Sequence, residues 1–114
     1  MSLERVFKTL EDFGLSRMDA EVYVYLAKIG PKKGRELANA LNISKQQLYP
    51  RLKNLKEKGV VAASLERPAL FSAVAFEKVV ELLITIKMEQ VEAFKETKKE
   101  MLDSWRSIDW HEQM

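Results

Sequence analysis

The chain has 114 residues, of which 46% are hydrophobic and 32% charged, and its net charge is +2. These values fit one globular domain with an appended element and exclude a disordered tail. The absence of cysteine excludes disulfides, thiolate metal sites and thiol catalysis.

Two helices are expected before residue 30. Apolar residues with helical spacing occupy 3–13, and Gly14 ends that pattern. Ser16 is a suitable N-cap for a second helix, which ends before the pair Gly30-Pro31. The side chains of the second helix that we expect in the core are Ala20, Tyr23, Val24, Leu26 and Ala27.

A helix-turn-helix is predicted next. A short helix opens at Lys33-Gly34 and runs through Leu41, and Asn42 tolerates the left-handed backbone that ends a helix. A turn of a few residues leads to Ser44, the N-cap of a helix over 45–58. Two short helices joined so tightly are typical of this motif, and the second one is its recognition helix.

The helix over 45–58 has two unlike faces. Its apolar stripe consists of Leu48, Leu52 and Leu55. Gln46, Pro50 and Lys53 lie roughly opposite, since each residue turns a helix by about 100°. An outward face of amides and cations suits the DNA major groove, where Gln pairs with adenine and Lys or Arg with guanine. A solvated Lys-rich surface is the alternative interpretation.

Charge is distributed unevenly along the chain. Residues 31–59 contain eight cations and two carboxylates, which gives +6 and leaves −4 for the remainder. This asymmetry predicts one basic surface that would attract a polyanion.

After Gly59 the residues favour two strands, over 60–64 and 70–74. Residues 65–69 connect them, and Pro68 blocks further pairing. A helix-turn-helix followed by a hairpin is a winged helix, with Arg67 at the wing tip. That side chain is placed to reach a phosphate or the minor groove, or else it is a solvated loop charge.

From Phe76 to about residue 108 the chain predicts one long helix, which would outrun the small domain before it. The fold class expected is therefore mainly α. It consists of a winged helix-turn-helix domain over 1–75, with three to four helices and a two-stranded β-wing, then a long C-terminal helix and short tail over 76–114. The residues expected to form a homodimer contact are Ile84, Met88, Val91, Phe94, Met101, Leu102 and Trp105.

Two lysines, Lys95 and Lys98, interrupt a strict heptad in that helix, so we expect a dimerising helix and not a regular coiled coil. The alternatives are that it folds back on its own core or docks a different chain.

No enzyme chemistry is expected. The only histidine, His111, lies near the end of the chain, and the four glycines are isolated turn and cap residues. We therefore expect no catalytic residues, no metal site and no cofactor. The N-terminus is not a signal peptide and there is no membrane-spanning run, so the predicted location is cytoplasmic with no membrane partner.

The chain resembles the TrmB family of archaeal transcriptional regulators over about residues 10 to 76. The residues that carry the resemblance are Gly14-Leu15-Ser16, Tyr23, Gly30-Pro31, Leu37-Ala38, Ile43-Ser44, and Leu48-Tyr49 through Gly59. MarR-like and ArsR-like repressors share much of this pattern. The resemblance implies a sequence-specific regulator that binds double-stranded DNA as a homodimer.

Two features depart from the family pattern. Larger members carry a C-terminal sugar-sensing domain, which this chain is too short to contain, so a sugar effector is not expected and any effector is unknown. Pro50 stands inside the recognition helix, where it removes the N–H that would bond the Gln46 carbonyl, so we expect a bend there.

The leading hypothesis places twelve residues at the DNA. The residues expected nearest the bases are Gln46, Gln47, Pro50 and Lys53. Those expected toward the backbone are Lys32, Lys33, Arg35, Ser44, Lys45, Tyr49 and Arg51, with Arg67 from the wing. The alternative is a winged-helix adaptor in a transcription-related assembly. A further hypothesis is a ligand cleft between the long helices and the winged domains, with Tyr25, Met88, Phe94 and Trp105 as candidate lining residues. The favoured alternative is that these residues are ordinary core or dimer contacts.

Overall fold

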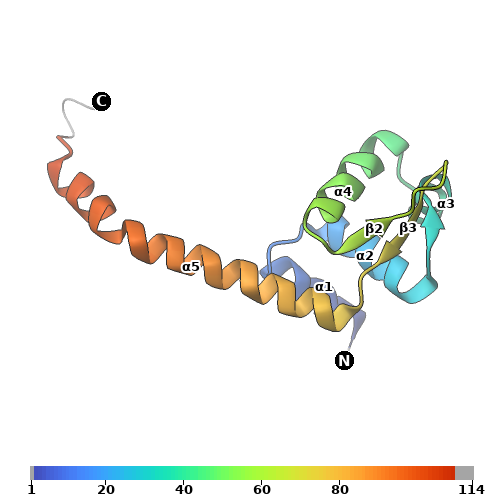
Figure 1. The fold of residues 1–114 in the computed structure, drawn as a ribbon, viewed down its shortest axis with the longest axis horizontal. Helices are drawn as coiled ribbons and strands as arrows, with labels where there is room; N and C mark the ends of the chain where they lie inside the picture. Colours follow the sequence, from blue (N-terminus) through green and yellow to red (C-terminus); the bar gives the residue numbers. More distant parts are fainter. Residues whose placement is uncertain (1, 110–114) are drawn as a thin grey trace. The chain divides into compact units, whose positions relative to one another are not determined.

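The structure, a computed structural model, describes residues 2–109. Figure 1 shows its elements in chain order. The helices and strands are α1 (Leu3–Asp12), α2 (Arg17–Ile29), β1 (Lys32–Lys33), α3 (Gly34–Leu41), α4 (Lys45–Glu57), β2 (Val61–Ala63), β3 (Leu70–Ala73) and α5 (Phe76–Ser107). Every helix expected from the sequence is present. Among the described residues, no helix has the length and apolar content needed to cross a membrane.

The chain divides into two compact units, the first ending at Leu83 and the second beginning at Ile84. The sequence placed the division after residue 75, at the start of α5. The difference arises because Val79 and Leu83, in the first turns of α5, are buried and complete the core of the first unit.

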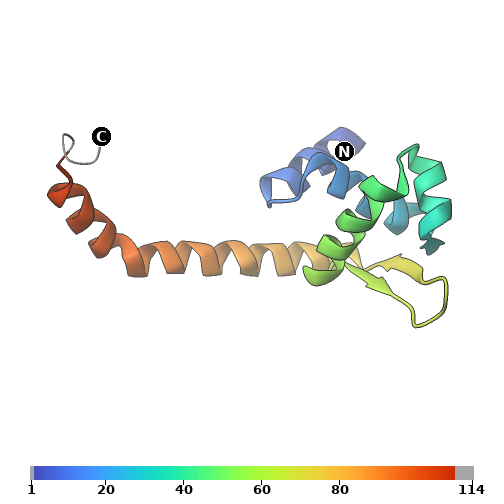
Figure 2. The same ribbon diagram turned by 90° about the horizontal axis from the view of Figure 1, so that it is seen from above.

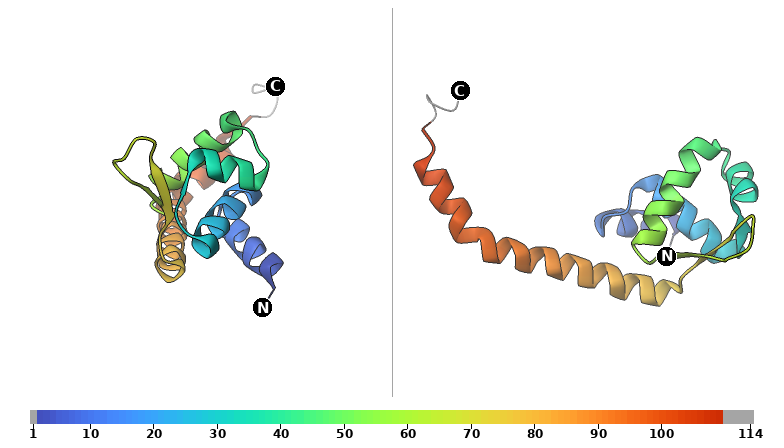
Figure 3. Two further views of the ribbon diagram at one scale, coloured as in Figure 1. Left: turned by 90° about the vertical axis from the view of Figure 1, so that its right-hand side faces the viewer. Right: turned by 45° about the horizontal axis from the view of Figure 1, so that its top comes forward.

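Helices α2, α3 and α4 pack around this core, which Figure 3 shows from two sides. The largest fully buried side chains are Tyr23, Leu10, Leu26, Leu37, Leu48, Leu52, Leu55, Val22, Val60 and Val79. The predicted apolar stripe of α4 is therefore confirmed. On α2 one expectation was wrong: Ala27 is exposed, because the last turn of α2 from Ala27 to Ile29 is not covered by other parts of the domain. Val22, which was not expected in the core, is buried.

A three-stranded antiparallel sheet, in the order β1-β3-β2, flanks the helices. Lys32 and Lys33 of β1 pair with Phe71 and Leu70 of β3. The predicted two-stranded wing is β2 and β3, and Figure 2 shows both strands leading into an open loop. Strand β1 is an addition that the sequence did not reveal, because two lysines show no alternation of apolar and polar residues.

Tyr23 joins α2 to the end of the sheet. Its ring is fully buried, and its hydroxyl donates a 2.6 Å hydrogen bond to the Val74 carbonyl. Its ring centroid lies 6.5 Å from that of Phe76, the first residue of α5. Burial raises the pKa of the Tyr23 phenol. The hydrogen bond ties the core of the winged domain to the point where the wing passes into α5.

Arg17 joins α1 to α2 at the surface. Its guanidinium donates to both carboxylate oxygens of Glu4, at 2.6 and 2.9 Å, and to Glu21 at 3.0 Å. It also lies 4.3 Å from the centroid of the Phe7 ring. The hydrogen bonds from Arg17 hold the pKa of the Glu4 carboxyl below its usual range. Helix α1 is therefore held against α2 by the ion pair between Glu4 and Arg17 as well as by the burial of the Leu10 side chain.

Candidate nucleic-acid interface

The turn between α3 and α4 fixes the direction of the recognition helix. Asn42 has φ +55° and ψ +47°, the left-handed conformation expected from the sequence. The Ile43 N–H donates to the Ala38 carbonyl at 3.1 Å, which closes the end of α3. With so few residues between the helices, α4 is rigidly oriented by α3.

A capping box begins α4. The Ser44 hydroxyl accepts from the Gln47 N–H at 3.1 Å, and the Gln47 side-chain oxygen accepts from the Ser44 N–H at 3.2 Å. Both residues were predicted to face DNA, and both are exposed. Both oxygens accept within the cap, so the Ser44 hydroxyl hydrogen and the Gln47 amide nitrogen remain as donors for a ligand.

The outward face of α4 is exposed as expected. Gln46, Pro50 and Lys53 lie on the solvent side, opposite the buried leucines, and Lys45 is exposed in the first turn. The helix is uninterrupted across Pro50. The bend expected there stays a prediction. The face presents one amide and two ammonium groups, a set that can reach acceptors on bases or phosphates.

Tyr49 has a packing role in addition to its exposure. Its side chain is 45% exposed, yet its hydroxyl would lie 2.5 Å from a Cβ added at Gly34. The ring therefore lies directly over the first residue of α3, where only glycine leaves room for it. This contact braces the helix-turn-helix from outside.

Lys33 and Arg35 are exposed beside this contact, while Lys32 is half-buried in β1. The Lys33 N–H donates to the Glu36 carboxylate at 2.9 Å, so Glu36 caps α3 and does not form an ion pair with a lysine side chain. The side chains of Lys33 and Arg35 at the N-terminus of α3 can therefore contact a ligand.

Arg51 differs from the other cations of residues 31–59. It is the only one of the eight with an ion-pair partner among residues 2–109, Asp19 at 3.4 Å. The other seven are therefore free to attract a polyanion. They are Lys32, Lys33, Arg35, Lys45, Lys53, Lys56 and Lys58.

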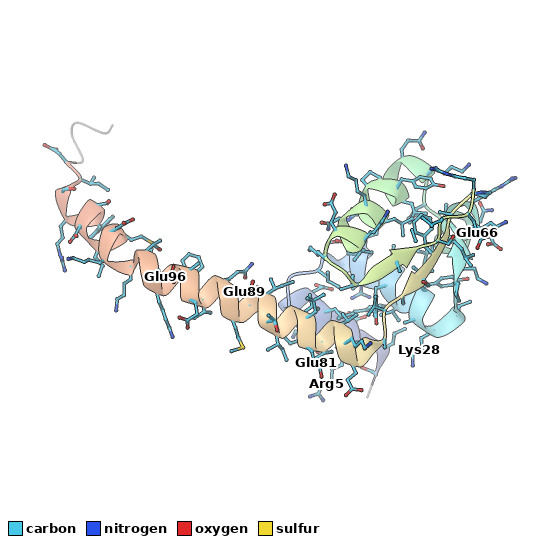
Figure 4. The ribbon with its side chains drawn as sticks, in the orientation of Figure 1. Arg5, Lys28, Glu66, Glu81, Glu89 and Glu96 are labelled. Atoms are coloured by element: carbon cyan, nitrogen blue, oxygen red, sulfur yellow. The ribbon has the colours of Figure 1, made fainter. Side chains whose placement is uncertain are left out.

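The wing loop carries exposed Leu65, Glu66, Arg67 and Pro68, and Glu66 is labelled in Figure 4. Arg67 is at the tip, as predicted, and Leu65 is 100% exposed. The loop is closed by the Leu70 N–H, which donates to the Ser64 hydroxyl at 2.8 Å. Sequence analysis did not single out Leu65. The sequence did contain a signal for it, since Leu65 is an apolar residue in an otherwise polar turn.

On α5 the predicted dimerisation residues are all exposed in the single chain, with exposed fractions from 41% for Ile84 to 74% for Trp105. Ile108 adds to this apolar surface. In Figure 4, Glu89 and Glu96 are labelled on the same helix. The second unit is a single described helix without a core of its own, so its apolar side chains require a partner to become buried.

The ligand cleft that the sequence suggests between the long helices and the winged domains stays a hypothesis. The first unit contains an apolar cavity of about 300 Å³, lined by residues of α1, α2 and the β3–α5 junction and by Lys28 (Figure 4). Tyr25 lines a different depression, and Met88 and Phe94 line two others on α5.

Sequence analysis also missed the contacts of Asp19, whose carboxylate accepts from both Arg51 and Asn54. No group of metal-binding side chains occurs in residues 2–109. His111 lies outside the described residues.

Comparison with known proteins identifies the family. A family model described as "Sugar-specific transcriptional regulator TrmB" matches residues 10–77. The chain belongs to the TrmB family. This confirms the resemblance seen in the sequence. The family consists of transcriptional regulators, which are not enzymes, in agreement with the sequence analysis.

Among TrmB-related proteins, the chain is 28% identical over 98 residues to the HTH-type sugar sensing transcriptional regulator TrmBL1 of Pyrococcus furiosus. That match covers 86% of this chain and 29% of the relative, so the chain spans less than a third of that protein.

A solved structure of TrmBL2, described as an archaeal chromatin protein with a novel mode of DNA binding, superposes with a TM-score of 0.79 and 26% identity. The match covers 91% of this chain and 42% of TrmBL2. The transcriptional regulator Tm0710 of Thermotoga maritima shares the fold, with a TM-score of 0.57, 23% identity, and 87% and 77% of the two chains covered. These neighbours confirm the predicted winged-helix fold with a long C-terminal helix.

Proposed function

We propose that the chain is a sequence-specific regulator that binds double-stranded DNA as a homodimer. The observation that carries this proposal is the exposed outward face of α4 within a fold of the TrmB family. On that face Gln46 and Lys53 are free of partners among the described residues, and six further unpaired cations lie within residues 31–59. An α-helix with such a face fits a B-DNA major groove.

The division of roles follows from the contacts. Gln46, Pro50 and Lys53 would lie nearest the bases, together with the Gln47 amide nitrogen. Lys45, Lys33 and Arg35 would contact phosphates, since their ammonium and guanidinium groups carry full charge without an internal partner. Arg67 would reach the backbone or the minor groove from the wing.

The interface is tested by fluorescence-anisotropy titration of a random duplex pool and of the sequences selected from it. Gln46→Ala and Lys53→Ala should each weaken binding to the selected sequence by about tenfold, as expected for a lost base contact. Lys8→Ala is the matched control, because it removes the same charge as Lys53→Ala from exposed α1. Equal effects of Lys8→Ala and Lys53→Ala would refute the assignment of the reading face.

The homodimer rests on the apolar surface of α5. Residues 84 to 108 place large apolar side chains in water at helical spacing, and a second copy of the helix is the simplest partner that covers them. A two-fold dimer would bring two recognition helices to successive major grooves, with half-sites about 34 Å apart.

The dimer is tested by light scattering after size exclusion. Val91→Glu should shift the protein to a monomer, because it introduces a charge into the apolar surface. Gln90→Glu introduces the same charge one residue away and should leave the dimer intact. A monomeric wild type, or identical masses for both variants, would contradict the proposed interface.

A further inference from the structure

A polar cluster lies where α2 meets α4. Asp19 is the only buried charged residue in the described part of the chain, with an exposed fraction of 4%. Its carboxylate accepts from Arg51 Nη1 at 3.4 Å through one oxygen and from Asn54 Nδ2 at 3.2 Å through the other. Ser16 Oγ accepts from the same Arg51 Nη1 at 3.1 Å. Both α4 side chains are thus held by α2.

The guanidinium of Arg51 is therefore held by hydrogen bonds at Nη1, whereas Nη2 makes none to a described residue. Nη1 is held by Asp19 and Ser16, and Nε is buried with no hydrogen-bond partner. Nη2 has no partner among residues 2–109 and does not belong to the buried atoms. The side chain as a whole is 36% exposed. The contacts therefore leave Nη2 accessible and unpaired on a guanidinium that Asp19 and Ser16 hold in place.

Arg51 lies beside the proposed reading face. Arg51, Asp19 and Asn54 line a polar hollow of about 390 Å³ together with Gln46, Gln47 and Pro50 of the outward face. A base edge that approaches Gln46 would therefore also come near Arg51. Because its rotamer is already fixed, Arg51 loses little conformational entropy when it binds.

The charge of the hollow favours a base over a phosphate. The buried Asp19 carboxylate offsets the charge of Arg51, so the pair attracts a phosphate more weakly than an unpaired arginine would. A base acceptor carries only a partial negative charge. Guanine presents two such acceptors, O6 and N7, in the major groove.

We propose that Asp19 is a positioning residue for sequence readout, which orients Arg51 so that Nη2 donates to a guanine in the major groove. The inference rests on the proposed DNA-binding function. It separates Arg51 from the phosphate-contacting cations, because an arginine that is already paired adds specificity more than general affinity.

The test selects preferred sequences from a random duplex pool with wild type, Asp19→Asn and Arg51→Lys, and then measures affinity for matched, single-mismatch and non-specific duplexes. Asp19→Asn keeps the shape of the side chain but removes its charge. Arg51→Lys keeps a cation beside Asp19, so the fold does not depend on a lost ion pair. Asp12→Asn is the control, since it makes the same chemical change on the exposed end of α1.

We expect both variants to lose about tenfold of the discrimination for guanine at the same single position, with affinity for non-specific DNA retained. Asp12→Asn should match wild type. Uniform weakening on all sequences would assign Arg51 to a phosphate, and an unchanged preference would make Asp19 structural only. Either result would overturn this inference while the DNA-binding function stands. No binding by folded wild type would overturn both.

Discussion

The hydrogen bond between Tyr23 and the Val74 carbonyl makes a quantitative prediction. Tyr23→Phe removes the hydroxyl and keeps the ring, so the packing against Phe76 is retained. The loss leaves a carbonyl without its donor, which costs about 1–3 kcal/mol when the acceptor is buried. Val74 is half-buried, so water can partly replace the donor, and we expect a loss of about 1–1.5 kcal/mol.

Urea unfolding at a fixed protein concentration measures this loss as a lower midpoint with an unchanged slope. For a domain of this size, 1 kcal/mol corresponds to a melting temperature lower by about 4–8 °C. Tyr25→Phe is the control, because the Tyr25 hydroxyl has no hydrogen bond to a described residue. Equal midpoints for Tyr23→Phe and Tyr25→Phe would refute the assigned role.

The same residue predicts an alkaline effect. The Tyr23 pKa is raised by burial, so above the ordinary phenol pKa of about 10 the unfolded chain releases this proton before the folded one does. The contribution to stability is therefore complete below about pH 10 and decreases as the pH rises further. Tyr23→Phe lacks this component, so its stability deficit should narrow above that pH.

Three other perturbations have defined outcomes. Asn42→Ala should cost about 1 kcal/mol in chemical unfolding because Ala tolerates the left-handed backbone poorly, whereas Asn42→Gly should cost nothing. Pro50→Ala should stabilise the protein by about 1–2 kcal/mol, since it restores an N–H for the Gln46 carbonyl, and an unchanged midpoint would contradict this. Glu4→Gln should lower the protection factors of the α1 amides, which compare each exchange rate with the intrinsic rate at the same pH. In wild type these protection factors should fall as the pH drops through the depressed Glu4 pKa, because the pairing with Arg17 is lost.

Much of the fold was predictable because each helix is delimited by local chemistry. Ser16 and Ser44 cap α2 and α4, Asn42 adopts the left-handed conformation, and Gly59 has φ +82° after α4. The leucine stripe of α4 is buried in full. These features depend on neighbours within four residues, where sequence patterns carry direct information.

What the sequence did not reveal depends on contacts between distant segments. β1 forms only because β3 has a free edge beside Lys32 and Lys33. Asp19 looked like an ordinary capping residue, and its contact with Arg51 joins residues 32 positions apart. Val79 and Leu83 are buried in the core of the first unit. The sequence of α5 alone did not show which of its turns contact that core.

The measurement that tests the central claim most directly is the affinity of wild type for duplex DNA across a salt series. With six to eight phosphate contacts, the logarithm of the binding constant should fall against the logarithm of salt concentration with a slope of about −5 to −7. A steep slope of this size would establish the basic surface of α3 and α4 as the DNA interface. A slope near zero, or no binding at low salt by folded protein, would contradict the account.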